Sequence, residues 1–334
     1  MAGSGNAQLR DDPDMLLRVE DLVVEFPVDR RSKVHAVSGV SFDVSDGETL
    51  GIVGESGCGK STAARAVIQL PPPTSGKVEY MGRDLTKLRG DQLRRIRPDL
   101  QMIFQDPISS LNPRRTVRDI ISEGLAVWGN RQGVWSQDRI DELMEAVGVD
   151  PRFGDRKPHQ FSGGQCQRIG IARALALDPR ILICDEPVSA LDVSVQAQIL
   201  NLLEDMKKRY GLTLLFISHD LSVVKNISDR IVVMYLGKVC EIGAADELYE
   251  HPAHPYTRAL LASIPEPAPT VDVGEGDIEG ELPSPITPPV GCRFNTRCPH
   301  ADEICRTVEP ETRAWGDGDH YVACHHPVET AVGI

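Results

Sequence analysis

The sequence predicts an α/β protein built on a largely parallel sheet that is covered by helices on both faces. Short apolar segments of strand length alternate with longer segments whose apolar residues recur at helical spacing. One apolar segment, residues 49–53, runs directly into a glycine-rich turn and then into a helical segment. The chain has 334 residues, of which 41% are hydrophobic. That length suits a domain of about 250 residues with an appendage.

The expected elements follow from local pattern in chain order. Strands are predicted where apolar residues are continuous, at residues 49–53, 101–104, 181–184, 213–217 and 231–235. Helices are predicted at residues 60–70, over most of 119–147, and at 169–177. Pro71 ends the first helix, since proline cannot continue it. Continuous apolar strands separated by helices favour a parallel sheet buried on both faces.

Composition excludes several classes of function. The net charge of −13 and the pI near 5.2 argue against a nucleic-acid binder and against docking on anionic lipid. No apolar segment approaches the roughly 20 residues that a membrane-spanning helix needs. Residues 1–14 are polar and acidic and lack the apolar core of a signal peptide. We therefore expect a cytosolic protein without a membrane span, which reaches a membrane only through a protein partner.

The chain is expected to divide into four regions. Residues 1–14 are interpreted as a flexible tail, and residues 15–263 as the main domain with a helical subdomain at about 107–177. Residues 264–289 are rich in proline, glycine and acidic residues and are interpreted as a linker. Residues 290–334 form a cysteine-rich C-terminal region.

The glycine-rich turn after residues 49–53 fits the phosphate-binding pattern G-x-x-x-x-G-K-S, with a strand before it and a helix after it. Glycines let backbone N–H groups curl around an anion, and the helix N-terminus adds a positive end. Lys60 is expected to reach the β- and γ-phosphates of ATP, and Ser61 to ligate Mg²⁺. The predicted ATP-binding residues of this loop are Gly54, Glu55, Ser56, Gly57, Cys58, Gly59, Lys60, Ser61 and Thr62.

Two acidic residues follow the predicted strand at 181–184. Asp185 is the candidate Mg²⁺ ligand, and Glu186 is the candidate general base that polarises the attacking water. Acids at a strand end are also common as solvated side chains, and the upstream phosphate loop is what favours the catalytic interpretation.

Further motifs carry a family resemblance. Residues Phe161, Ser162, Gly163, Gly164 and Gln165 resemble the signature sequence of ABC ATPases. Gln105 resembles the Q-loop glutamine of that family, and His219 resembles its switch histidine. Ser189, Ala190, Leu191 and Asp192 resemble its D-loop. Each motif is weak alone, but all occur in the family's order, and the resemblance covers about residues 16–261.

The resemblance implies a fold and a mode of action. The expected fold is a P-loop ABC ATPase domain, with a RecA-like core, an antiparallel β subdomain and a helical subdomain, plus a small Cys-rich extension. The signature would close on ATP held by a partner subunit, so that ATP joins a dimer. His219 would contact the γ-phosphate, and Gln105 would sense the γ-phosphate and Mg²⁺. Phe26 is the positional candidate for stacking on adenine, and a packed strand aromatic is the alternative.

Three stretches, residues 104–113, 254–261 and 291–299, resemble the oligopeptide and dipeptide importer branch, and within it the F-type subunit. The implied partners are a homologous D-type ATPase, two transmembrane permease subunits and, indirectly, an extracytoplasmic substrate-binding protein. The implied location is the cytoplasmic face of the bacterial cell membrane. A nickel or other small-solute importer is the alternative. A soluble ABC ATPase and a module that binds ATP without hydrolysing it are more distant, because the chain has one phosphate loop and retains Glu186 and His219.

The C-terminal region holds four clustered cysteines, Cys292, Cys298, Cys305 and Cys324. In a cytosolic chain such a cluster favours a metal site over disulfides. The spacing lacks the C-x₂-C pairs of common zinc ribbons, and four thiolates can hold a [4Fe–4S] cluster. Similar tails in the resembling importer ATPases are associated with such a cluster. Zinc and unligated thiols remain the alternatives, and His320, His325 and His326 lie close in sequence.

Overall fold

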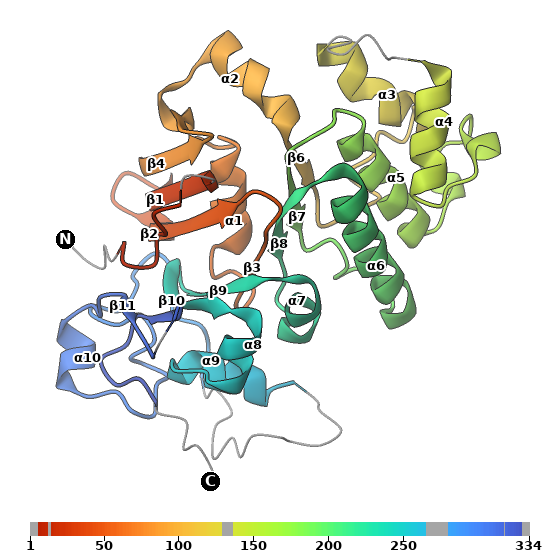
Figure 1. The fold of residues 1–334 in the computed structure, drawn as a ribbon. Helices are drawn as coiled ribbons and strands as arrows, with labels where there is room; N and C mark the ends of the chain where they lie inside the picture. Colours follow the sequence, from red (N-terminus) through yellow and green to blue (C-terminus); the bar gives the residue numbers. More distant parts are fainter. Residues whose placement is uncertain (1–5, 13–14, 129–135, 265–279, 317, 329–334) are drawn as a thin grey trace. The chain divides into compact units, whose positions relative to one another are not determined.

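The computed structural model describes residues 6–12, 15–128, 136–264, 280–316 and 318–328 (Figure 1). They form two compact units. Unit 1 combines Met1–Leu88 with Ser218–Ile334, and unit 2 is the intervening segment Arg89–Ile217. No helix in the described part of the chain is both long and apolar enough to span a membrane.

Unit 1 contains an antiparallel sheet in the order β2-β1-β4-β5. Its strands are β1 (Met15–Pro27), β2 (Lys33–Ser45), β4 (Ser75–Tyr80) and β5 (Arg83–Asp84). Leu17, Val19, Leu22 and Val24 of β1 are buried, and the two-residue periodicity is interrupted by a bulge between Val19 and Leu22. The bulge keeps apolar residues facing the core on both sides of the irregularity.

A second group of paired strands in unit 1 has the order β11-β12-β10-β9-β3. Its strands are β3 (Thr49–Val53), β9 (Arg230–Tyr235), β10 (Lys238–Ala244), β11 (Arg313–Ala314) and β12 (Tyr321–Val322). β3 and β9 are parallel, and the pairs from β9 outward are antiparallel. The helices of this unit are α1 (Lys60–Val67), α7 (Leu221–Ile227), α8 (Ala245–Glu250), α9 (Pro255–Ala262) and α10 (Glu303–Thr307).

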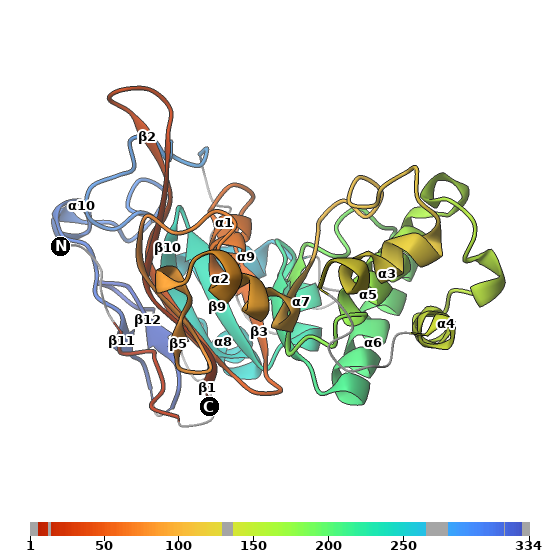
Figure 2. The ribbon, with the colours of Figure 1, turned by 90° about the horizontal axis from the view of Figure 1, so that it is seen from above.

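Unit 2 contains three parallel strands in the order β8-β7-β6. They are β6 (Leu100–Ile103), β7 (Ile181–Asp185) and β8 (Thr213–Ile217). Its helices are α2 (Gly90–Ile96), α3 (Val117–Trp128), α4 (Gln137–Ala146), α5 (Gly163–Leu175) and α6 (Val193–Tyr210). Helices α3 and α4 pack on α5 and form a helical group (Figure 2). The mixed sheets and helices confirm the predicted α/β class.

The structure corrects two helix boundaries. The helix predicted at residues 60–70 ends at Val67, because Gln69 has a left-handed φ of 60° and Leu70 precedes proline, which disfavours helical geometry. Apolar periodicity places the next helix only from residue 169, whereas the signature resemblance implies a helix that opens at Ser162; the helix begins at Gly163, because Ser162 caps it. The segment 119–147 holds α3 and α4, and residues 129–135 between them lie outside the described residues.

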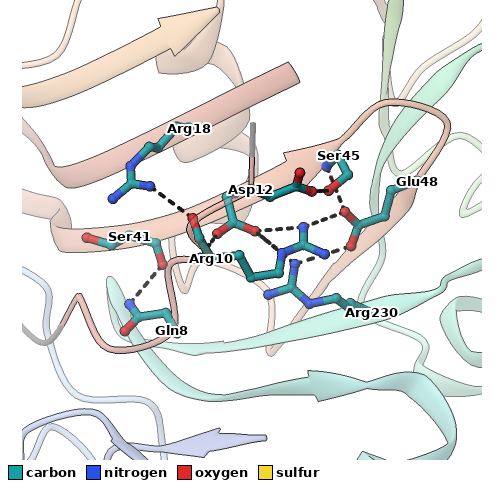
Figure 3. A network of polar contacts seen from close by, with 9 residues as sticks. Gln8, Arg10, Asp12, Arg18, Ser41, Ser45, Glu48 and Arg230 are labelled. Atoms are coloured by element: carbon teal, nitrogen blue, oxygen red, sulfur yellow. Dashed lines mark hydrogen bonds and ion pairs between the residues drawn. The ribbon is translucent and has the colours of Figure 1, made fainter. Parts of the chain in front are cut away.

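Part of the predicted N-terminal tail contacts the sheets of unit 1 (Figure 3). The backbone N–H and the guanidinium of Arg10 both donate to Asp43, and the guanidinium also donates to Glu48 at 2.6 Å. Arg230 donates to the same two carboxylates, at 2.9 Å to Asp43 and 3.2 Å to Glu48. The side chain of Gln8 donates to the carbonyl of Ser41. The segment 6–12 is therefore held against β2 by hydrogen bonds from Arg10 to the buried carboxylate of Asp43.

The predicted linker, 264–289, lies partly outside the described residues, which resume at 280. The carbonyl of Pro285 accepts a hydrogen bond from the N–H of His35 at 2.9 Å, so this part of the segment runs along the start of β2. The C-terminal region that follows joins the second sheet, because β12 pairs with β10 through Glu241 and Ile242. The four boundaries proposed from sequence remain predictions.

Candidate functional site

The phosphate loop connects β3 to α1 in unit 1, as the sequence predicts. Gly54, Gly57 and Gly59 have φ values of 149°, 81° and 105°, which side chains rarely adopt. A Cβ at Gly54 would lie 2.1 Å from the carbonyl oxygen of Met234, and one at Gly59 would lie 2.1 Å from that of Ala36. Only glycine therefore allows this loop to pass between β9 and β2.

Lys60 is the first residue of α1 and is buried, with 4% of its surface exposed. Its Nζ donates to the carbonyls of Gly54 at 2.6 Å and Glu55 at 3.0 Å, so the ammonium lies within the loop. The helix N-terminus and the ammonium give the loop two sources of positive potential. Burial raises the pKa of the Cys58 thiol, so this residue packs as a small apolar side chain.

Two further predicted residues, His219 and Phe26, belong to unit 1. Ser218 donates its N–H to the carbonyl of Ile52 at 3.2 Å, which brings the adjacent His219 to the end of β3. His219 is exposed. Phe26 pairs with Val34 across β1 and β2, and 39% of its surface is exposed. An exposed ring near the strand that borders Gly59 is able to stack on a base.

The predicted catalytic carboxylates lie in unit 2. Asp185 ends β7 and is fully buried, and Glu186 follows with 8% of its surface exposed. Glu186 has a φ of 48°, an uncommon conformation for a side-chain-bearing residue, and its N–H donates to the carbonyl of Ile217 at 3.0 Å. Non-glycine residues held in this conformation concentrate at functional sites. Gln105 donates from Nε2 to Oε2 of Glu186 at 2.9 Å, so the structure brings these two predicted residues together.

The signature residues form the exposed start of α5. The Ser162 hydroxyl accepts from the N–H of Gln165 at 3.3 Å, and the Gln165 side chain accepts from the N–H of Ser162 at 3.0 Å. In this reciprocal capping box, Ser162 and Gln165 satisfy each other's backbone N–H groups. The other N–H groups of the first turn point out of the helix N-terminus. A Cβ at Gly164 would lie 2.6 Å from Val195, so a glycine is required for packing against α6.

The D-loop residues lead into α6. Asp192 accepts hydrogen bonds from the Ser194 hydroxyl at 2.7 Å and from the N–H of Val195 at 3.0 Å, and it caps the helix. These bonds, that of Ser194 first, lower the pKa of Asp192. Ser189 and Ala190 are exposed and Leu191 is half-buried. The D-loop is thus an exposed turn whose last residue, Asp192, caps α6.

The four C-terminal cysteines lie close to one another. Burial first, with a smaller contribution from the neighbouring Cys292, Cys298 and Cys305, raises the pKa of Cys324 to about 12. The N–H of Cys292 donates to the carbonyl of Cys305 at 2.8 Å. Within the described residues, one group of three ligand-type side chains has its ligand atoms within 4.8 Å of one another, namely Asp302, Cys305 and His326. His320 lies elsewhere, against Glu241 at 2.7 Å.

Comparison with known proteins agrees with this geometry. The family profile described as ABC transporter matches residues 37–189, and the profile for the oligopeptide/dipeptide transporter C-terminal region matches residues 240–305. The oligopeptide transport ATP-binding protein OppF of Salmonella typhimurium is 51% identical over 93% of this chain and 96% of that protein. The chain belongs to the oligopeptide/dipeptide family of ABC transporter ATP-binding proteins.

Other relatives of this ABC ATPase have similar coverage. Oligopeptide transport protein AppF of Bacillus subtilis is 50% identical over 93% of this chain and 97% of that one. Di/tripeptide transport ATP-binding protein DppF of Pseudomonas aeruginosa is 45% identical, over 94% of this chain and 98% of that protein. The solved ATP-binding cassette MJ0796, a dimer bound to ADP and Pi in a post-hydrolysis state, has a TM-score of 0.63, 29% identity, and coverage of 69% of this chain and 99% of that one. The protein is an ATPase with the P-loop ABC fold.

Sequence reasoning missed two residues of this ABC ATPase that contact its phosphate loop. Arg297 donates to both carboxylate oxygens of Glu55 at 3.0 Å, and the Tyr256 hydroxyl accepts from the N–H of Glu55 at 2.9 Å. Both residues lie in stretches that the sequence singled out for their family resemblance. Nothing in the sequence indicates their contact with a loop more than 200 residues away.

Proposed function

We propose that this chain powers the import of di- and oligopeptides, working in an ATP-sandwich dimer with a homologous D-type ATPase. The observation that supports it most is about 50% identity, over nearly the whole chain, to proteins named for oligopeptide transport. The dimer would lie at the cytoplasmic face of the cell membrane, bound to two permease subunits that receive peptide from an extracytoplasmic binding protein. Nickel or another small solute is the alternative cargo.

The chemistry of these side chains suits this reaction. The N–H groups of the phosphate loop and the Lys60 ammonium would hold the β- and γ-phosphates. Ser61, Gln105 and Asp185 offer oxygen atoms of the kind that Mg²⁺ prefers, and bound Mg²⁺ would neutralise charge on the phosphates. Glu186 would accept the proton of the attacking water, with Gln105 orienting its carboxylate.

The remaining motifs divide between the nucleotide of this chain and that of its partner. His219 would contact the γ-phosphate, and Phe26 would stack on adenine. The outward N–H groups of the α5 N-terminus would bind the γ-phosphate held by the partner ATPase. The D-loop, from Ser189 to Asp192, would lie at the same dimer interface.

Uptake measurements test the cargo. Labelled dipeptides, oligopeptides and nickel are supplied to the native host, with redundant importers removed, carrying Glu186→Gln or the matched control Glu204→Gln. Glu204 is a helix-surface residue 3.7 Å from Lys208. We expect Glu186→Gln to abolish peptide uptake and leave nickel uptake unchanged, and Glu204→Gln to affect neither. Normal peptide uptake with expressed Glu186→Gln would contradict the peptide assignment.

We further propose that Cys292, Cys298, Cys305 and Cys324 hold a [4Fe–4S] cluster. The four thiols lie near one another, and burial raises the pKa of Cys292 to about 11, so a bound cationic group would be needed to stabilise the thiolates. Zinc would draw its sulfur ligands together to about 3.8 Å, given Zn–S bonds of about 2.3 Å. No three of these four sulfurs lie within 4.8 Å of one another in this structure, so they are not preformed for zinc.

Metal analysis distinguishes the alternatives for these cysteines. Protein purified anaerobically is expected to contain about four iron and four sulfide per chain, as the [4Fe–4S] composition requires. Cys298→Ser should lower the iron content, while Cys184→Ser, a matched change at a fully buried cysteine of β7, should not. Stoichiometric zinc without iron would overturn the cluster proposal. Protein that contains neither iron nor zinc would also overturn it and would indicate unligated thiols.

A further inference from the structure

The C-terminal region meets the phosphate loop at Glu55. One guanidinium nitrogen of Arg297 lies 3.0 Å from each carboxylate oxygen of Glu55 and 3.3 Å from the hydroxyl of Tyr235. The Arg297 side chain is 7% exposed and that of Glu55 is 28% exposed. The ion pair is therefore largely removed from water, where opposite charges interact more strongly than on an open surface.

The supporting side chains form a buried aromatic cluster of Tyr235, Tyr256 and Phe294. The ring of Tyr235 lies 4.8 Å from that of Tyr256 and 5.2 Å from that of Phe294, in edge-to-face arrangements. His254 caps α9 by accepting the N–H of Tyr256 at 3.0 Å. The residues that reach Glu55 are thus fixed by packing and by a helix cap, and do not depend on mobile surface side chains.

Glu55 is a negative charge within a loop that binds a polyanion. Its own carbonyl lies 3.0 Å from the Lys60 ammonium, which places its side chain within a Debye length, about 8 Å at physiological salt, of that ammonium. Without a counter-charge, this carboxylate would oppose phosphate binding. Arg297 supplies the counter-charge from a region beyond the residues that match the general ABC transporter profile.

We propose that Arg297 is a positioning residue of the nucleotide site, which neutralises Glu55 and holds it, with Tyr256, so that the loop can accept a triphosphate. The inference rests on the proposed role of the loop in binding ATP. It also gives the C-terminal region a direct part in setting nucleotide affinity. A positioning role by charge differs from simple support of the fold, because removing Glu55's charge should compensate for removing Arg297.

The test is a double-mutant cycle on nucleotide affinity. Arg297→Met is expected to raise the Kd for MgATP about tenfold, in keeping with one uncompensated charge at short range. Arg297→Met/Glu55→Gln should recover most of that loss. Glu55→Gln alone should lower the Kd, because Arg297 then adds net positive charge. The loss in Arg297→Met should decrease from ATP to ADP and vanish for adenosine, a trend that a purely structural defect would not produce.

Two controls keep the outcomes distinct. Lys60→Ala should abolish MgATP binding, and retained binding there would reject the loop as the nucleotide site. If Lys60→Ala behaves as expected, two results would overturn the role of Arg297. One is a double variant whose affinity for MgATP does not recover, and the other is an equal loss of affinity for ATP and for adenosine. If Arg297→Met does not fold, the single variant Glu55→Gln decides the question: a Kd raised above that of the native chain contradicts the proposal.

Discussion

Glu186→Gln is expected to lower the kcat for ATP hydrolysis at least about 100-fold, the usual contribution of a positioned general base. Glutamine retains an oxygen that can accept from Gln105, which lies 2.9 Å from the carboxylate, but it cannot take a proton from water. The loop of unit 1 is untouched, so the Kd for MgATP should change little. Phosphate release at saturating ATP, with the partner ATPase present, measures the loss.

The same variant should accumulate as an ATP-bound dimer with its partner, which light scattering in MgATP and in MgADP would detect. Glu204→Gln is the matched control, because it makes the same chemical change on the surface of α6. Hydrolysis by Glu186→Gln within about threefold of the native rate would contradict the assignment, since loss of a general base costs far more.

Arg230→Met is expected to destabilise unit 1 by about 3–5 kcal/mol, as does removal of one partner from a buried ion pair. Arg230 is 7% exposed and binds Asp43 and Glu48, which are 0% and 9% exposed. Methionine keeps much of the side-chain volume, so the loss reports the charge. Of the two arginines that bind both carboxylates, Arg10 would then remain.

Urea unfolding followed by circular dichroism measures this change. The matched control is Arg152→Met, because the Arg152 side chain is 85% exposed and pairs with Asp150 on the surface. Exposed pairs contribute about 0–1 kcal/mol, so this control should hardly move the unfolding midpoint. If the unfolding midpoint of Arg230→Met is close to that of Arg152→Met, the ion pairs of Arg230 make no net contribution to the free energy of unfolding.

The local parts of the fold could be predicted from sequence. The strand at residues 49–53, the glycine-rich loop and the start of α1 at Lys60 are determined within about 20 residues, by apolar continuity, glycine φ angles and a helix N-terminus. The family resemblance named Gln105 and Glu186 as site residues, but the hydrogen bond between them comes from the structure. These features depend on residues whose chemistry permits few alternatives.

The remaining features depend on contacts between distant segments. The contact between Arg297 and Glu55 joins residues 242 positions apart, and Arg10 meets Asp43 through a segment whose composition is that of a tail. Apolar periodicity alone places the start of α5 too late, at residue 169, because the first turn of this helix is polar and glycine-rich. Charge pairing between such segments has no periodicity for a sequence pattern to detect.

The pairing of β12 with β10 has a consequence for how molecules of this protein behave toward one another. In the order β11-β12-β10, removal of the C-terminal region would make β10 the edge of its sheet, with the backbone groups of Glu241 and Ile242 unpaired. An open strand edge is a template for pairing with another chain. The two-residue strand Tyr321–Val322 thus acts as a cover against aggregation, and a chain shortened before it should self-associate even if its ATP-binding loop is intact.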